Sequence, residues 1–136
     1  MKKCIFIFSC FLAILTFSCN KGSKQTTEGG NSSLFGKWIL VESLLDPGDG
    51  SGKWTAVDKP NYYYLQLESD SSVESNVYIG LNNARRFTVV NDSVMTFTFG
   101  GGETNKYAYR LGADNSSLTI TGGCFEPCGS KFVRGR

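Results

Sequence analysis

The sequence of 136 residues contains no histidine. Histidine is the commonest general base and the commonest metal ligand in proteins, so its absence excludes catalysis by a Ser/His or Cys/His pair. Two carboxylates can act together as acid and base, but no spacing among the 12 acidic residues singles out such a pair. We therefore predict that the protein is not an enzyme, that it needs no cofactor and that it holds no metal.

Long apolar runs are also scarce, and the clearest one lies at the N-terminus. Two lysines follow Met1, and residues 4–17 are almost wholly apolar. These 14 residues are fewer than the roughly 20 that span a bilayer, and the order of a basic start, an apolar run and a small residue is typical of a secretory signal. Because Ser18 is followed by Cys19, the segment resembles a bacterial lipoprotein signal of the relaxed Bacteroidetes type. The resemblance implies that residues 1–18 are removed and that Cys19 carries a lipid.

The chain also lacks a large excess of positive or negative charge. The chain has 14 basic and 12 acidic side chains, and removal of Lys2 and Lys3 with the signal leaves equal numbers of each. A neutral chain does not indicate a nucleic-acid surface or a basic helix that binds anionic lipid. We expect contact with the membrane through the N-terminal lipid alone, and no nucleic-acid partner.

Cysteine is scarce in the mature chain. Cys4 and Cys10 leave with the signal and Cys19 is acylated, so only Cys124 and Cys128 remain as thiols. An even pair in an exported chain predicts a disulfide. Zinc would need two further ligands, and a redox-active pair is disfavoured because the spacing is not Cys-x-x-Cys.

The composition divides the mature chain into a tether and one domain. Residues 20–33 contain no apolar side chain and cannot offset the entropy cost of ordering, so residues 19–33 are predicted to be a flexible tether. The folded part is expected to cover residues 34–136. In lipoproteins of the Bacteroidetes type an acidic cluster after the lipidated cysteine resembles a surface-export signal, and its absence here favours an outer-membrane lipoprotein that faces the periplasm.

From residue 34 onward the apolar residues alternate with period two, and no helical stripe is present. The fold class is therefore all-β. Strands in chain order with tight turns predict an antiparallel up-and-down sheet that removes its edges by closing into a barrel. We expect eight strands at residues 34–45, 62–68, 73–79, 86–90, 94–99, 107–111, 118–121 and 131–134.

The same alternation predicts which side chains fill the barrel. Glu42 shares its parity with Trp38 and Leu40, so it is expected to point inward toward Arg134 or Arg110. The other inward positions are predicted to be Met95, Phe97, Phe99, Tyr107, Tyr109, Leu111, Leu118, Ile120 and Phe132.

Three segments carry a resemblance to a known family. Gly36-Lys37-Trp38 resembles the Gly-x-Trp signature of lipocalins, in which the tryptophan closes one barrel end and an arginine of the last strand packs across it. The resemblance assigns barrel closure to Gly36, Trp38 and Arg134. Together with residues 46–54 and 124–134, this segment is similar to small lipocalin-like lipoproteins of Bacteroidetes. The resemblance implies an eight-stranded lipocalin-like barrel over residues 34–136.

Residues 46–52 contain two aspartates among glycines, which raises the question of a calcium loop. A helix-loop-helix calcium loop needs acids at alternate positions and a glutamate at the twelfth, whereas here glycine fills the third and fifth positions and Val57 the twelfth. The other interpretation is a wide connection that overhangs the open barrel mouth. Trp54 then either acts as a lid residue or packs on the rim.

Aromatic residues give the positive indication of binding. Tyr62 and Tyr64, with Trp54 and Tyr78, are candidates to line a mouth that stacks on a sugar or an apolar ligand. The alternative is that these rings pack the barrel itself. Separately, Ser93 lies in Asp-Ser-Val, which resembles the acceptor for protein O-glycosylation in Bacteroidetes.

Two functions remain open. The first is a monomeric, lipid-anchored binding module of the cell envelope that takes a small apolar or glycan-derived ligand at the barrel mouth. The second is a structural or interaction lipoprotein with a filled barrel, which binds a protein partner through its loops. An interior filled by Met95, Phe97, Phe99, Tyr107 and Tyr109 would argue against an internal carrier.

Overall fold

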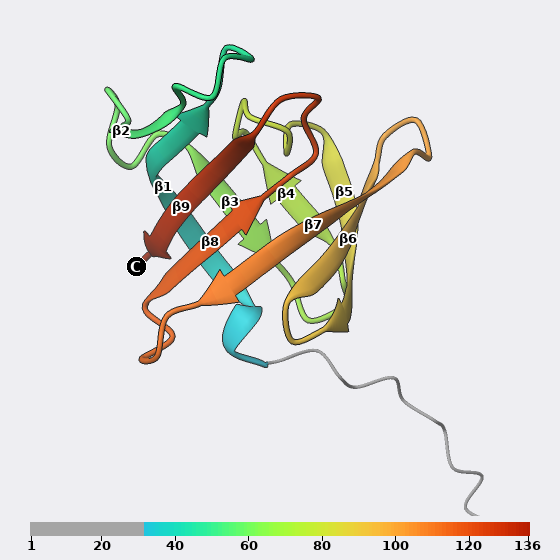
Figure 1. Cartoon of the computed structure of the whole chain (residues 1–136). Coiled ribbons are helices and arrows are strands. Elements are labelled where there is room, and N and C mark those ends of the chain that lie inside the picture. The colour runs from blue at the N-terminus through green and yellow to red at the C-terminus, as the bar shows by residue number, and fades with distance from the viewer. Residues whose placement is uncertain (1–31) are drawn as a thin grey trace, which may run out of the picture.

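The computed structural model describes residues 32–136, so the predicted signal segment, Cys19 and most of the predicted tether lie outside the described residues. The described chain is a single antiparallel sheet that follows one short 3-10 turn, η1 (Ser32–Leu34) (Figure 1). Two residues assigned to the tether, Ser32 and Ser33, belong to this turn. The strands are β1 (Gly36–Leu45), β2 (Lys53–Ala56), β3 (Tyr64–Leu67), β4 (Val73–Ser75), β5 (Ala84–Asn91), β6 (Val94–Phe99), β7 (Thr104–Leu111), β8 (Ser117–Thr121) and β9 (Cys128–Arg134).

The strands pair as the sequence predicts. Their order in the sheet is β4-β3-β1-β9-β8-β7-β6-β5, so neighbours in the chain are neighbours in space, and the last strand returns to the first. This confirms an all-β, eight-stranded antiparallel barrel of lipocalin-like arrangement. The short strand β2 was not predicted; it pairs with the second half of β1, whereas β3 pairs with the first half.

The barrel closes at two junctions of unequal strength. β1 and β9 form a long ladder from Trp38 opposite Arg134 to Leu45 opposite Cys128. Between β4 and β5, by contrast, the connection is the single bridge Ser72–Arg86 and a hydrogen bond from the Phe87 amide to the Ser71 carbonyl (3.0 Å). The sheet is thus nearly closed, with a thin seam.

The interior is filled by the protein's own side chains. Trp38, Phe97 and Phe132 are among the largest fully buried residues, and Met95 is fully buried beside them. Phe99 differs from the prediction in being only half-buried, because it lies at the end of β6. The other buried members of this core are Leu34, Leu40, Leu65, Leu67, Val73, Val77, Leu81, Ala84, Phe87, Tyr107, Tyr109, Leu118 and Ile120. These side chains occupy the space that an internally carried ligand would need.

A β-bulge in β1 changes the direction of the side chains that follow it. The register with β9 shifts between Leu40 and Glu42, so the alternation that places Trp38 and Leu40 inside is reversed beyond Val41. The prediction that Glu42 points inward is therefore wrong. Glu42 lies on the outer face and pairs with Lys131 (2.6 Å), while Ser43 takes the buried position.

The two ends of the barrel are built differently. The end that holds η1 also holds the short turns at residues 91–93 and 112–116 and the C-terminus; we call it the closed end (Figure 1). The opposite end carries the connections at residues 46–52, 76–83, 100–103 and 122–127, which stand at the top of the view. We call this the open end.

Candidate functional site

At the closed end, Arg134 joins the last strand to the start of the fold. Its guanidinium carbon lies 4.0 Å from the centroid of the Trp38 ring, and Nη1 donates to the Phe35 carbonyl (2.5 Å). Nη2 donates to the Ser33 carbonyl, and the Trp38 indole donates to the Leu34 carbonyl at 2.7 Å. The arrangement satisfies carbonyls that η1 leaves without helical partners.

Gly36 lies beside the Arg134 guanidinium. Its φ is +113°, and a β-carbon there would lie 3.0 Å from Arg134 Nη1. The three residues that the resemblance assigned to barrel closure, Gly36, Trp38 and Arg134, are thus brought together. Because a cation over a tryptophan ring and buried hydrogen bonds are stabilising contacts, these three residues form a structural closure.

At the open end, the glycine-rich connection at residues 46–52 is organised by Asp46. One carboxylate oxygen accepts hydrogen bonds from the amides of Gly48 (2.8 Å) and Gly50 (3.1 Å), and the other accepts from Gly52 (3.0 Å). These bonds, the one from Gly48 foremost, lower the pKa of the Asp46 carboxyl. The carboxylate is therefore occupied by its own backbone, and no group of three or more possible metal ligands occurs within residues 32–136.

The disulfide predicted from the sequence is formed by Cys124 and Cys128, whose α-carbons are 6.0 Å apart. The bridge closes the 122–127 connection at the tip, where Phe125 is fully exposed (102%). The loop also contacts the 46–52 connection, since the Asp46 amide donates to the Pro127 carbonyl at 3.1 Å.

Trp54 does not lie at the barrel mouth. Leu44 of β1 pairs with Trp54 of β2 on one side and with Gly129 of β9 on the other. A β-carbon at Gly129 would come within 2.7 Å of the Trp54 ring, and the Lys131 ammonium lies 4.3 Å from the ring centroid. Trp54 therefore packs across the outer face of the sheet, in the space that glycine leaves.

The three consecutive tyrosines separate into two groups. Tyr64 lies beside Lys37 (4.7 Å from ring centroid to Nζ), and its hydroxyl donates to Glu74, which raises the tyrosine pKa. Tyr62 and Tyr78 instead contact Tyr63 edge to face, with centroid distances of 4.9 and 5.0 Å. Of the four predicted ligand-binding aromatics, the structure brings only Tyr62 and Tyr78 into one cluster.

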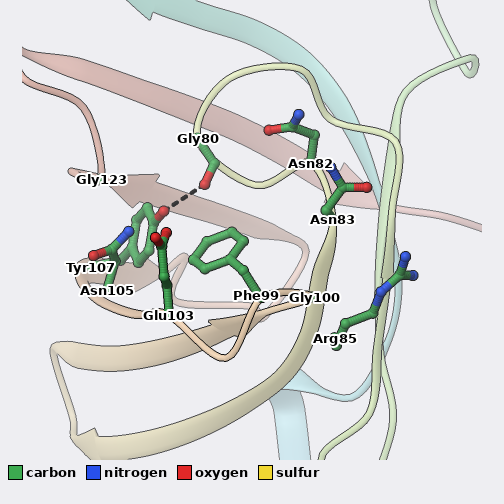
Figure 2. Close-up of a pocket in the computed structure, with 11 residues that line it drawn as sticks. Gly80, Asn82, Asn83, Arg85, Phe99, Gly100, Glu103, Asn105, Tyr107 and Gly123 are labelled. Atoms are coloured by element: carbon green, nitrogen blue, oxygen red, sulfur yellow. Dashed lines mark hydrogen bonds between the residues drawn. The ribbon is translucent and has the colours of Figure 1, made fainter.

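The structure places an open, polar cleft at the open end, with a volume of about 570 Å³ (Figure 2). In Figure 2 the Phe99 ring lies between the 76–83 connection, which carries Asn82 and Asn83, and the strand that carries Asn105 and Tyr107. The remaining lining residues are Gly80, Arg85, Gly100, Gly101, Glu103 and Gly123.

One wall of the cleft is fixed by Tyr107. Its hydroxyl donates to the Gly80 carbonyl (2.5 Å), as the dashed line in Figure 2 marks, and burial raises the pKa of the phenol. Gly123 has φ +80°, and a β-carbon there would lie 2.2 Å from the Tyr107 ring. The glycine is therefore required for the 122–127 connection to approach this wall.

Sequence reasoning missed this cleft. Its residues come from three separate connections and three strands, and none of them stands in a motif. The available signal was weak: the paired asparagines at 82 and 83 in a turn-prone stretch and the three glycines from 100 to 102 mark connections, without indicating which of them meet in space.

Ser93, the predicted acceptor for a glycan, lies in the exposed turn between β5 and β6. Its amide and hydroxyl both donate to the Asn91 side-chain oxygen, at 2.9 and 3.1 Å. The turn therefore presents the serine at the closed end, away from the cleft.

Comparisons with protein families, with curated proteins and with solved structures found no match for this chain. Within residues 32–136, the helical content is too short and too polar for a membrane span.

Proposed function

We propose that the protein is a lipid-anchored binding module of the cell envelope, similar to small lipocalin-like lipoproteins, and that it takes a glycan-derived ligand in the cleft at the open end. The observation that carries the proposal is the polar cleft itself, formed at one end of a barrel whose interior is filled. A filled interior leaves the mouth as the place for a small ligand.

The chemistry of the lining favours a glycan over an apolar ligand. Asn82, Asn83 and Asn105 offer amide donors and acceptors, while Arg85 and Glu103 add groups of opposite charge. Sugar hydroxyls both donate and accept hydrogen bonds, so such mixed side chains can pair with them. Apolar ligands bind in sites lined mainly by apolar side chains, which this cleft lacks apart from the two aromatic rings.

The position of the cleft agrees with an N-terminal anchor. The chain enters the fold through η1 at the closed end, whereas the cleft opens at the other end. If the lipid is attached at Cys19, the cleft is free to face away from the anchoring membrane. We place the protein at the outer membrane, facing the periplasm, as a monomer.

The experiment that tests the site is calorimetric titration of the protein with panels of oligosaccharides, using Asn105→Ala and Glu103→Gln as cleft variants. Both residues are exposed, so the fold is expected to survive. We expect each variant to weaken binding about tenfold, which is the cost of roughly one lost hydrogen bond at 1.4 kcal/mol. Thr88→Ala, at an exposed position of β5 outside the cleft lining, is the matched control and is expected to bind as the wild type does.

The anchor has its own test. Metabolic labelling with a fatty acid is expected to mark the wild-type protein and not Cys19→Ser, and the variant is expected to leave the membrane fraction. Labelling of the variant, or an unlabelled wild type, would refute the anchor without affecting the cleft.

The filled interior equally supports the second interpretation, an interaction lipoprotein that binds a protein partner through its loops. Failure of every oligosaccharide to bind the wild type would favour it, and so would binding that both cleft variants leave unchanged.

A further inference from the structure

We infer that the ligand of the cleft is an oligosaccharide chain that extends beyond the cleft and rests on the exposed rings of Phe125 and Tyr78. The inference builds on the proposed function, because it names the size of the ligand for the same site. Both rings are carried by connections that also line the cleft.

Both aromatic residues are close in sequence to residues that line the cleft. Tyr78 comes two residues before Gly80, and Phe125 comes two residues after Gly123, and both glycines line the cleft. The two connections also touch each other, since a β-carbon at Gly80 would lie 3.7 Å from the Cys124 sulfur. The two residues therefore lie within two positions of the cleft lining along the chain.

Both rings are exposed; side-chain contacts hold the Tyr78 ring, and a disulfide constrains the loop that carries Phe125. Tyr78 is 48% exposed; its ring contacts Tyr63 edge to face, and its hydroxyl lies 3.4 Å from the Ser43 hydroxyl. Phe125 sits at the tip of a loop of five residues that the Cys124–Cys128 bridge closes. The bridge restricts the backbone that carries Phe125, so less backbone entropy is lost when a ligand covers its ring.

The exposure of these apolar rings to water is energetically unfavourable unless a ligand covers them. A fully exposed phenylalanine keeps its whole apolar surface in water, and fixing it there with a disulfide does not reduce that exposure. Exposed aromatic groups at the edge of a polar cleft commonly mark binding surfaces. The apolar faces of pyranose rings can cover an aromatic face while their hydroxyls reach the polar lining.

The surroundings of Phe125 distinguish this occupant from an anionic membrane. Glu126 follows Phe125, and its carboxylate would lie 3.4 Å from a β-carbon at Gly48, so it stands against the connection that carries Asp46 and Asp49. The carboxylates of Glu126 and of the connection that it contacts place negative charge on this group of loops, which repels an anionic surface. A neutral chain of sugars meets no such repulsion.

The test is calorimetric titration with three series of oligosaccharides, from one to six residues: N-acetylglucosamine oligomers, β-glucans and α-glucans. We expect affinity to rise at least about tenfold between one and four residues in the series that binds. Phe125→Ala and Tyr78→Ala are each expected to weaken the tetramer about three- to tenfold and to leave the monomer unchanged. Tyr64→Ala, which removes a ring from the outer face of the barrel, is the matched control.

The outcomes separate this inference from the proposed function. Binding that does not depend on chain length, or that is unchanged in Phe125→Ala and Tyr78→Ala, overturns the oligosaccharide and leaves the cleft as a site for a single sugar. Failure of all three series at millimolar concentration overturns both. Circular dichroism of each variant checks that the barrel remains folded, and binding by the Tyr64→Ala control equal to the wild type completes the expected pattern.

Discussion

At the scale of single residues, two side chains do most to hold the ends of the barrel. Arg134 combines a stacking contact with Trp38 and hydrogen bonds to the carbonyls of Phe35, Ser33 and Asn115. This combination requires the planar guanidinium, which has several donors in fixed directions. Asp46 has the corresponding role at the open end, where its carboxylate gathers three amides of one connection.

Replacing Arg134 tests the closure. We expect Arg134→Lys to lower the free energy of unfolding by about 1–3 kcal/mol, because an ammonium cannot reach the three carbonyls and cover the ring together. Urea unfolding followed by tryptophan fluorescence measures the change. Arg136→Lys, at the exposed C-terminus, is the control, and equal urea midpoints for the two variants would contradict the proposed role of Arg134.

The stability of the 46–52 connection is expected to depend on pH through the Asp46 carboxyl. Its folded pKa lies below the ordinary value of 3.8, so its hydrogen bonds stabilise the fold at any pH above that value. The contribution is lost as the pH falls below 3.8 and passes the folded pKa, because the protonated group no longer attracts the amides as strongly. The amide proton shifts of Gly48 and Gly52 are expected to titrate with a midpoint below 3.8 and not to titrate in Asp46→Asn. A midpoint at or above 3.8 in the wild type would refute the prediction.

At the scale of elements, strand β1 shows how a local irregularity changes the faces of a sheet. Period-two reasoning is correct for Trp38 and Leu40 and fails at Glu42, because a bulge adds one residue and reverses the alternation. Nothing in the alternating pattern marks the bulge in advance, since both Glu42 and Ser43 are polar. The long pairing of β1 with β9 tolerates it and places the Glu42–Lys131 ion pair outside.

The packing of β2 on β9 gives a prediction for Gly129. A β-carbon there would approach the Trp54 ring to 2.7 Å and the Ile120 carbonyl to 3.2 Å, so something must move. We expect Gly129→Ala to cost about 1–3 kcal/mol of stability and to shift tryptophan emission to longer wavelength as Trp54 is displaced into water. Gly101→Ala is the control, because a β-carbon at Gly101 would have no atom within 4 Å. An unchanged emission spectrum would show that Trp54 does not depend on this glycine.

The disulfide stabilises one connection rather than the whole sheet. Because it closes a loop of only five residues, Cys124→Ser combined with Cys128→Ser is expected to lower the free energy of unfolding by about 2 kcal/mol. The far-ultraviolet circular dichroism of the double variant is expected to remain that of the folded sheet. A loss much larger than this, or loss of the fold, would mean that the bridge supports strands as well.

At the scale of the whole molecule, the barrel is continuous everywhere except between β4 and β5. The β1–β9 ladder ties the two chain ends of the domain together, whereas the seam has the single Ser72–Arg86 bridge, to which the Phe87 amide bond belongs, and a hydrogen bond from Arg86 Nη2 to the Asp70 carbonyl. Local opening of a protein proceeds where few hydrogen bonds and contacts must be broken. The seam is therefore the place where this barrel opens most easily.

Hydrogen exchange tests that conclusion. The Phe87 amide, which bonds across the seam, is expected to exchange at least about tenfold faster than the amide of Leu40 in β1, which donates to the Tyr63 carbonyl, and the amide of Phe132 in β9. Exchange measured residue by residue by nuclear magnetic resonance gives the comparison. Equal protection of the three amides would show that the seam opens only when the whole barrel unfolds.

The sequence by itself determined eight of the nine strands, their order and most of the interior. Residues such as Met95, Phe97, Tyr107 and Ile120 follow a period of two, and a local period can be recognised without knowing what lies opposite. The pair Cys124 and Cys128 was recognisable for a similar reason, because four residues of chain already hold the two thiols near each other.

Only the tertiary structure decided where the cleft lies. The cleft joins Asn83, Phe99, Asn105 and Gly123, which are close only because the barrel brings its open-end connections to one place. The same geometry carries Trp54 to the outer face, separates Tyr64 from Tyr62 and turns Glu42 outward. Each of these depends on which strand lies beside which and in what register, and that information comes from contacts between distant segments rather than from any one stretch of sequence.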